Sequence, residues 1–293
     1  LIVPYPPGGV YDAIGRPLAE KLKVLLGAIA IENVGGASGS RGAALVARSQ
    51  PDGYTLMVGG TSEMVLVPLA ANKSQYDPMQ DFEPIARLGV VGVSFNTHPG
   101  VPAANLKELV AFAQANPGKL TFGSPGVGSL PHLTGELFKS MTNTPGIIHV
   151  PYAGSGPSLN DAVGGHILMA MATVSGQVLE LHRGGKLKML AVASATRLPV
   201  AEDVPTAEQA GYPGLIAMNF LGLFAPKGTP AAIVRQIAQA TTAAVNERDL
   251  KQFMTESGFQ ADATSGPDQL RGFLQGELDR WAPVVKASGF KVN

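Results

Sequence analysis

The chain has 293 residues, 45% of them hydrophobic, and its 22 basic and 22 acidic residues balance to a formal net charge of zero. This length favours two domains with sizeable cores, and the balanced charge argues against nucleic acid or a polyanionic surface as a partner. The sequence has no cysteine, which excludes thiol catalysis, disulfides and thiolate metal sites, and it has no apolar run long enough to cross a bilayer.

The chain begins abruptly inside an apolar strand. We interpret this start as trimmed, so the lack of a visible signal peptide is not evidence for a cytoplasmic location. The 36 glycines and 23 prolines stand beside plentiful apolar residues, which is typical of a compact protein with many turns rather than a disordered one.

Strands and helices alternate along most of the chain, which favours an α/β fold with a largely parallel sheet. In order, the pattern predicts strand 1–3, helix 11–25, strand 28–32, helix 42–47, strand 54–58 and a longer apolar strand 90–95. There follow helix 106–115, strand 120–122, helix 130–141, strand 147–150, helix 157–163, strand 167–172, helix 176–182 and strand 187–193.

Strand 219–225 comes next, and after it the chain is expected to be helical to its end. Thr229 is the expected N-cap of the first of these helices, with Pro230 at the first helical position. We interpret 90–98 and 219–225 as two hinge crossings between lobes. Residues 1–97 and 223–293 would form a discontinuous first lobe, residues 98–222 an inserted second lobe, and a cleft would lie between them.

The most informative motif runs from Phe122 to His132 and reads FGSPGVGSLPH. It predicts a short strand, a glycine- and serine-rich loop and the start of a helix. A helix that begins here would direct backbone N–H groups and a partial positive charge at whatever binds above the loop. The motif therefore predicts an anion site, and a carboxylate would suit it.

Four further loops have the same character: PYPPGG at 4–9, NVGGASG at 33–39, GGTS at 59–62 and HVPYAGSGP at 149–157. One such loop would mean little, because turns need glycine in any case. Five loops that each follow a β-like apolar run predict a crevice lined by strand ends, where open α/β sheets bind ligands.

These strings together resemble the Bug (TctC-like) solute-binding receptors of tripartite tricarboxylate transporters. The resemblance rests on PYPPGG with Asp12 and Arg16, GGASG at 35–39, PDGYTL at 51–56, the 122–129 loop with His132, HVPY at 149–152, DVPT at 203–206 and APKGTP at 225–230. The strings occur in order from the first residues towards the last helix, so the resemblance covers essentially the whole chain.

The resemblance implies a periplasmic receptor with a two-lobed type II binding-protein fold that closes around one small organic acid and delivers it to membrane permease subunits. It implies a monomer without a cofactor or metal. Matching ligand-binding positions would be Gly9, Val10, Tyr11, Asp12, Ser38, Thr61 and Ser62 in one lobe, and Ser124, Gly126, Gly128, Ser129, Tyr152, Gly154, Ser155, Thr173 and Ser175 in the other. Neutral donors at these positions would satisfy a carboxylate without burying a second full charge.

The sequence departs from the family pattern at one place. After the two glycines the family often carries small or polar residues, whereas this chain carries Val10 and Tyr11. If these side chains reach the cleft, the pocket gains apolar surface and a phenol hydroxyl. We therefore hypothesise a ligand with an aromatic or apolar portion, either a mono- or a dicarboxylate, in preference to a highly polar acid such as citrate.

Each candidate residue also has a purely structural interpretation. Ser129 could merely cap the following helix, and Asp12 with Arg16 could form an i,i+4 ion pair, which we favour. His132 has a structural role in our interpretation. Asp161 could cap a helix, brace the loop before it or contact an amine.

Two other classes of function are weighed against the receptor. Ser129 and His132 invite a serine-hydrolase interpretation, but no Gly-x-Ser-x-Gly motif and no acidic partner accompany them. A ligand-sensing domain for signalling is the second alternative, because the same two-lobed fold serves as an effector domain. We expect no enzyme activity, and no nucleotide or metal motif is present in the sequence.

Overall fold

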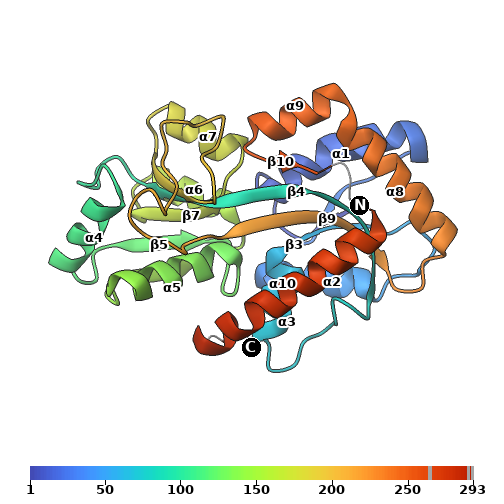
Figure 1. Ribbon diagram of the computed structural model, residues 1–293, viewed down its shortest axis with the longest axis horizontal. Coiled ribbons are helices and arrows are strands. Elements are labelled where there is room, and N and C mark those ends of the chain that lie inside the picture. Colours follow the sequence, from blue (N-terminus) through green and yellow to red (C-terminus); the bar gives the residue numbers. More distant parts are fainter. Residues whose placement is uncertain (263–265, 289–290, 292–293) are drawn as a thin grey trace. The chain divides into compact units, whose positions relative to one another are not determined.

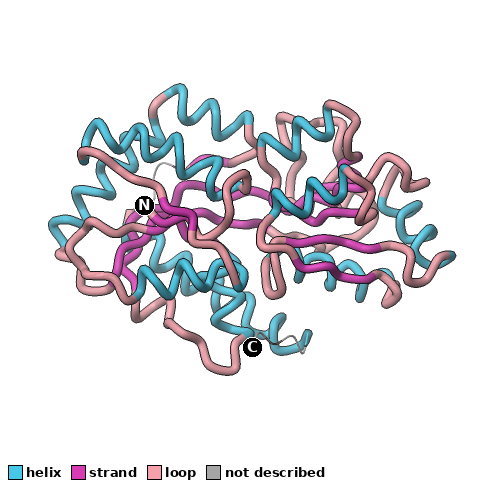
Figure 2. The backbone as a smooth tube through the Cα atoms, turned by 180° about the vertical axis from the view of Figure 1, so that it is seen from behind, coloured by secondary structure: helices cyan, strands magenta, loops and turns pink. Residues whose placement is uncertain are grey.

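The computed structural model describes residues 1–262, 266–288 and 291, and the chain divides into two compact units. Unit 1 consists of Leu1–Val90, Phe220–Thr255 and Gln260–Asn293, and unit 2 consists of Val91–Asn219 and Glu256–Phe259. In each unit, helices flank the strands (Figures 1 and 2).

Unit 1 has the strands β1 (Ile2–Val3), β2 (Glu32–Asn33), β3 (Met57–Gly60) and β10 (Gln260–Ala261). Its helices are α1 (Val10–Leu26), the short η1 (Ala37–Gly39), α2 (Ser40–Ala47), the π-helix η2 (Ser62–Leu66), α3 (Val67–Ala70), α8 (Ala231–Asn246), α9 (Arg248–Glu256) and α10 (Pro267–Ser288). The long strands β4 (Phe82–Thr97) and β9 (Met218–Pro226) have residues in both units.

The sheet of unit 1 runs in the order β2-β1-β3-β9-β4, and β10 pairs with β4. Strand β1 is parallel to β2 and β3, whereas β9 and β10 pair antiparallel with β3 and β4. Helix α1 buries Ile14, Leu18 and Leu22, which lie four residues apart on one face, and it packs against α8. Helix α10 packs against η2 and α3.

Unit 2 contains α4 (Leu106–Ala115), β5 (Thr121–Ser124), α5 (Leu130–Thr142), β6 (Ile148–Pro151), α6 (Ser155–Val163), β7 (Met169–Thr173), α7 (Gly176–Arg183) and β8 (Lys188–Ala193). Strand β5 is parallel to β6 and β7, and β4 is antiparallel to β7 and β8. The rings of Phe95 on β4 and Phe138 on α5 meet edge to face at 5.0 Å, which joins strand and helix in one core.

The division by contacts falls inside β4, between Val90 and Val91, and inside β9, between Asn219 and Phe220. The sequence boundaries were expected after residues 97 and 222. The sequence also did not suggest that Glu256–Phe259 would belong to unit 2, where Gly258 lies against Val174. Hinge motion about these crossings stays a prediction.

Several elements differ from the sequence prediction for identifiable reasons. Strand β3 begins at Met57 rather than Tyr54, because Tyr54 belongs to a turn in which its N–H donates to Asp52, and its side chain is 90% exposed. The Thr229 hydroxyl donates to the Pro226 carbonyl instead of capping a helix, so α8 begins after Pro230. Strand β10 interrupts the region that was expected to be helical to the end.

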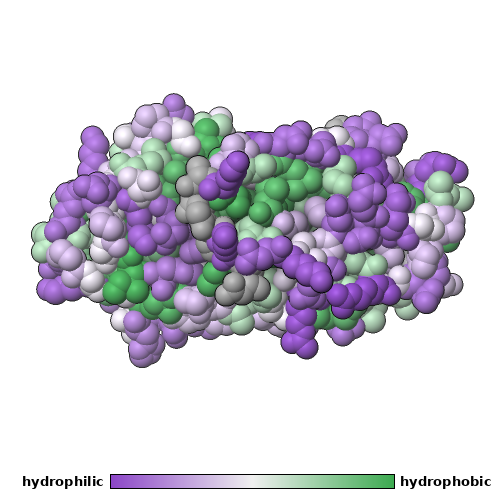
Figure 3. All heavy atoms as spheres, turned by 90° about the horizontal axis from the view of Figure 1, so that it is seen from below, coloured by the Kyte–Doolittle hydropathy of each residue, from purple (hydrophilic) through white to green (hydrophobic). Residues whose placement is uncertain are grey.

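The surface is predominantly polar. In the view of Figure 3, apolar residues form separate patches among hydrophilic ones. Within the described part of the chain, no helix is both long and apolar enough to cross a membrane.

Two helix-interior glycines offer a test of core packing. A Cβ at Gly135 on α5 would lie 2.5 Å from the Phe122 ring, whereas a Cβ at Gly272 on α10 would meet no atom within 4 Å. We expect Gly135→Ala to destabilise the protein by roughly 1–3 kcal/mol through overpacking. Gly272→Ala, the matched control, should stabilise it by about 0.5–1 kcal/mol through helix propensity. Urea unfolding of both variants checks this, and equal effects would contradict the packing of α5 on β5.

Candidate functional site

The loop between β5 and α5 satisfies its own polar groups. Ser129 is the N-cap of α5: its Oγ accepts from the N–H of His132 at 3.3 Å and donates to the Gly126 carbonyl at 2.7 Å. The Gly128 N–H donates to Nδ1 of His132 at 3.1 Å. Gly126 and Gly128 have φ of +132° and +88°, a region that glycine adopts readily. The capping role of Ser129 is therefore present, and these donors are engaged inside the loop.

Two histidines lie behind this loop as a stacked pair. The rings of His132 and His149 are 4.0 Å apart at 29°, and Ser124 Oγ lies 2.7 Å from Nε2 of His149. Burial lowers the pKa of His132 to about 4 and, with the neighbouring His132, the pKa of His149 to about 3. Both rings are thus neutral at neutral pH and serve the loop as uncharged hydrogen-bonding groups. The sequence analysis had not considered His149.

The loop between β6 and α6 leads into an uncapped helix start. Gly154 is the N-cap of α6, and no described side chain caps the first-turn N–H groups there. The Tyr152 hydroxyl donates to Asp161 at 2.7 Å, and burial together with this bond raises the pKa of Tyr152 to about 12. Asp161 therefore braces the loop. Ser155, the first residue of α6, is half-buried.

Thr173 and Ser175 follow the end of β7 and are buried. Ser175 is the N-cap of α7, and its Oγ accepts from the N–H of Val178 at 3.4 Å. Helix α7 is thus capped by its own chain, like α5.

In unit 1, the loop after β1 also opens on an uncapped helix. Gly9 is the N-cap of α1, and no side chain of the described residues caps that end. Asp12 forms the expected ion pair with Arg16 at 2.8 Å and accepts from Asn33 and the Gly8 N–H. Partial burial acts to raise the pKa of Asp12, but these hydrogen bonds outweigh it and lower the pKa below its usual value. Asp12 is therefore an ionised brace of the loop.

Val10 and Tyr11 are only 4% and 5% exposed within the structure. The Tyr11 ring lies 4.6 Å from the Tyr5 ring, and its hydroxyl donates to Glu63 at 3.2 Å. The phenol hydroxyl that the sequence analysis offered to a ligand is thus engaged with a carboxyl group of the same unit.

The remaining unit 1 candidates lie at the ends of the neighbouring loops. Ser38 has φ of +53°, and its carbonyl accepts from the Tyr5 hydroxyl at 2.9 Å. The Thr61 hydroxyl accepts from the N–H of Phe220 at 3.1 Å, and Ser62 begins the π-helix η2. All three side chains are buried.

Glu63 is the residue that sequence reasoning missed. Its carboxyl group has no exposed surface, and it accepts from the Gly60 N–H and from the hydroxyls of Tyr5 and Tyr11. Burial raises the pKa of Glu63 to about 8. The sequence signal was present as the charged residue in the apolar run 64–67, but only the fold shows that it points inward.

The geometry does not form a serine-hydrolase site. Ser129 and His132 are hydrogen-bonded to backbone groups of their own loop, and the serine–histidine contact that does exist joins Ser124 to His149, where Ser124 is fully buried. A nucleophile must reach its substrate, so this pair is structural. Among the described residues, no group of three or more metal-ligating side chains lies together.

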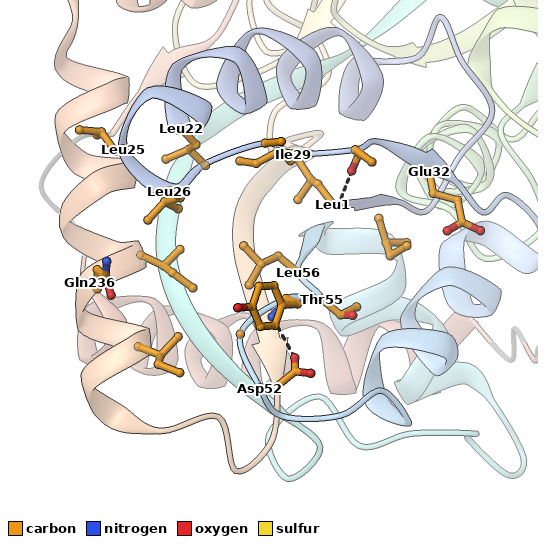
Figure 4. A pocket seen from close by; sticks show the side chains of 17 residues that line it. Leu1, Leu22, Leu25, Leu26, Ile29, Glu32, Asp52, Thr55, Leu56 and Gln236 are labelled. Atoms are coloured by element: carbon orange, nitrogen blue, oxygen red, sulfur yellow. Dashed lines mark hydrogen bonds between the residues drawn. The ribbon is translucent and has the colours of Figure 1, made fainter.

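A pocket of about 620 Å³ lies elsewhere in unit 1, between the end of α1, residues 28–32, residues 52–56 and α8. Its wall is largely aliphatic, with Leu22, Leu26 and Leu56 facing it and Glu32 and Asp52 near its margin (Figure 4). It contains none of the sequence-predicted site residues. Without convergent hydrogen-bond donors it does not fit a carboxylate, and we keep the loop ends as the candidate site.

Comparisons with known proteins agree with this site chemistry. The family model described as "Tripartite tricarboxylate transporter family receptor" matches residues 14–290. The chain is 34% identical to the protein BugT of Bordetella pertussis over 295 residues, covering 100% of this chain and 90% of BugT.

Two similar solved structures carry small dicarboxylates. MatC of Rhodopseudomonas palustris with bound malate is 31% identical with a TM-score of 0.91, and the match covers 97% of each chain. Rpa4515 of R. palustris with adipate is 30% identical with a TM-score of 0.92, covering 99% of this chain and 97% of that one. The expected periplasmic binding protein fold is thereby confirmed.

The histidine pair predicts a specific sensitivity to acid. The folded pKa values lie below the usual 6.5, so the unfolded chain binds more protons as the pH falls from 6.5 to about 4. The stability that the neutral pair retains at pH 7 is lost across this window. We expect His149→Gln to reduce the loss by on the order of 2 kcal/mol, while His166→Gln, at an exposed position, leaves it unchanged. Denaturant unfolding at several pH values measures both, and identical pH profiles would contradict the assignment.

Proposed function

Because the chain belongs to the tripartite tricarboxylate transporter receptor family, we propose that it is a periplasmic receptor that binds a small organic dicarboxylate and delivers it to membrane permease subunits. Family membership supports the receptor class. The malate in MatC and the adipate in Rpa4515 support dicarboxylates as the ligand class.

The observation that carries the proposal is the difference between capped and uncapped helices. Helices α4, α5 and α7 begin with Asn105, Ser129 and Ser175, each of which caps its own helix. Helices α1 and α6 begin with Gly9 and Gly154, which have no side chain to do so. An uncapped helix start offers backbone N–H groups and a partial positive charge, and a carboxylate satisfies both.

We assign carboxylate binding to the backbone of Gly9, Val10 and Tyr11 at α1 and of Gly154 and Ser155 at α6. The other predicted site residues would act on these loops. Serines 129 and 175 cap helices, and Asp12 and Tyr152 brace the two loops through Arg16 and Asp161.

The hypothesis of an aromatic or apolar ligand is narrowed by the structure. The Tyr11 hydroxyl is engaged with Glu63, so the phenol supplies no specificity towards a ligand in this arrangement. The neutral donors favour a carboxylate but do not select what joins two carboxylates. We therefore propose aliphatic dicarboxylates as the first class to test, with aromatic mono- and diacids in the same panel.

A thermal-shift screen tests the ligand class. The panel contains malate, adipate, succinate, citrate, benzoate and phthalate, and a ligand at a hundred times its Kd should add about 2.7 kcal/mol of stability. We expect adipate or malate to raise the melting temperature clearly. Stabilisation by citrate alone would contradict the proposed dicarboxylate class, and stabilisation by benzoate alone would restore the apolar-ligand hypothesis.

Removal of one backbone donor tests the helix starts. Gly154 is extended, with φ of −177° and ψ of 174°, so proline fits at the first position of α6 and replaces an N–H group at little structural cost. We expect Ser155→Pro to weaken dicarboxylate binding by about tenfold or more, since a hydrogen bond to a charged group contributes about 1.5–3 kcal/mol. Isothermal titration calorimetry measures the change.

Two controls separate this effect from others. Ser155→Ala removes the hydroxyl and keeps the N–H group, so it isolates the backbone donor. Asn105→Ala removes the cap of α4, outside the proposed site, and should lower stability by about 1 kcal/mol without changing affinity. Equal affinity of Ser155→Pro and the wild type would refute the assignment to α6.

A further inference from the structure

The three candidate loops of unit 1 converge on one buried carboxyl group. Oε1 of Glu63 accepts from the N–H of Gly60 at the end of β3, and Oε2 lies 3.2 Å from the hydroxyls of Tyr5 and Tyr11, on the loop after β1 and on α1. The Tyr5 hydroxyl also reaches the carbonyl of Ser38 in the loop before α2, at 2.9 Å. One side chain therefore links the ends of the segments that carry every unit 1 site residue.

The approach is close enough to dictate neighbouring residues. A Cβ at Gly60 would lie 2.4 Å from the Tyr11 hydroxyl, and a Cβ at Gly39 would lie 2.9 Å from Oε2 of Glu63. The Tyr76 hydroxyl donates to the backbone carbonyl of Glu63 and holds the π-helix from the other side. The network is thus enclosed by packed groups.

No described cation pairs with this carboxyl group, and the charged groups on the surrounding elements have partners of their own. On α1, Asp12 is paired with Arg16. On α10, Glu277 is paired with Arg280 and accepts from Trp281, and Arg271 is paired with Glu83. On α2, Arg41 lies against Gly36. The titratable groups in contact with Glu63 itself are the hydroxyls of Tyr5 and Tyr11, with Tyr76 at its backbone.

Proton counting favours a neutral carboxyl group. The Tyr5 hydroxyl has one proton and faces two acceptors, the Ser38 carbonyl and Oε2 of Glu63. If Tyr5 donates to Ser38, a protonated Glu63 can donate to the Tyr5 oxygen, and every group in the network is satisfied. A buried carboxylate without a cation would carry a large desolvation cost. The raised pKa of Glu63, about 8, agrees with this count.

We propose that Glu63 is a positioning residue that, as a neutral acid, holds the three loops of unit 1 in place and keeps a negative charge away from the bound carboxylate. The proposal rests on the proposed function and deepens it. When Glu63 ionises, two effects reduce affinity: like charges repel, and the Tyr5 proton is drawn from Ser38 towards the carboxylate. Affinity for a dicarboxylate should therefore be high below pH 8 and fall as the pH rises through that value.

A first pair of measurements needs no ligand. The infrared difference spectrum between the wild type and Glu63→Gln at pH 7 should show the band of a protonated carboxyl group. Hydrogen exchange followed by mass spectrometry should show faster exchange in segments 5–11, 36–40 and 59–63 for Glu63→Ala and exchange close to that of the wild type for Glu63→Gln. A carboxylate band, or unchanged exchange in Glu63→Ala, would overturn the proposal whatever ligand the protein takes.

The second measurement is the Kd of adipate, or of malate where adipate does not bind, at about pH 6.5 and about pH 9.5, where both acids are dianions. We expect wild-type affinity to fall about tenfold, the effect of one like charge at about 12 Å with an effective dielectric constant of 20. Glu63→Gln should bind equally at both pH values. The matched control is Glu277→Gln, which neutralises a buried glutamate on α10 and should retain the wild-type pH dependence.

The outcomes distinguish this proposal from the proposed function. If the wild type binds neither acid at either pH, the dicarboxylate class fails, and the infrared and exchange measurements still decide the role of Glu63. If the wild type binds with a pH profile identical to that of Glu63→Gln, the receptor function stands and the role of Glu63 fails. A fallen affinity in the wild type, a flat profile in Glu63→Gln and the protonated band together support it.

Discussion

The rest of the structure depends on the pairing of strand β4. Its 16 residues pair antiparallel with β10 within unit 1 and with β7 and β8 within unit 2, and β9 is its hydrogen-bonded neighbour. A strand with partners along both edges has little freedom to shift, because a slip of one residue would turn buried side chains such as Phe82 and Phe95 to the wrong face. The loops that carry the candidate site are therefore attached to strands whose register is fixed.

Both units keep neutral titratable groups behind their loops. Unit 2 holds the stacked histidines 132 and 149 against Ser124, and unit 1 holds Glu63 against two tyrosines. Burial acts on these groups in opposite directions, lowering the pKa of the histidines and raising that of the glutamate, but it favours the uncharged form of each. An uncharged second layer lets backbone donors in the first layer act on an anion without competition from a fixed charge.

The division of labour among helix starts follows from the same economy of polar groups. Where Ser129, Ser175 or Asn105 precedes a helix, its oxygen satisfies one of the free N–H groups at that end. Where Gly9 or Gly154 stands in that position, the N–H groups remain for another acceptor. Two glycines in the right place thus leave a need for hydrogen bonds that a carboxylate meets.

Local sequence patterns determined the alternation of strands and helices, the receptor family and the loops that carry the site. These depend on apolar periodicity, glycine turns and ordered short motifs. Helix α4 was predicted with its exact bounds, since Asn105 and the Pro-Gly at 117–118 mark its ends through local hydrogen bonds and backbone conformation. The helix-capping role of Ser129 and the pairing of Asp12 with Arg16 were also readable from residue spacing.

Only the tertiary structure decided what depends on residues far apart in the chain. It showed that Tyr11 turns inward to Glu63, 52 residues away, that Ser124 meets His149 rather than a ligand, and that the loop first taken as the anion site satisfies its own donors. The physical reason is that burial and hydrogen-bond partners arise from packing between segments. A residue's type and spacing limit what it can do, but the groups packed against it determine whether its donors are spent within the fold or left for a ligand.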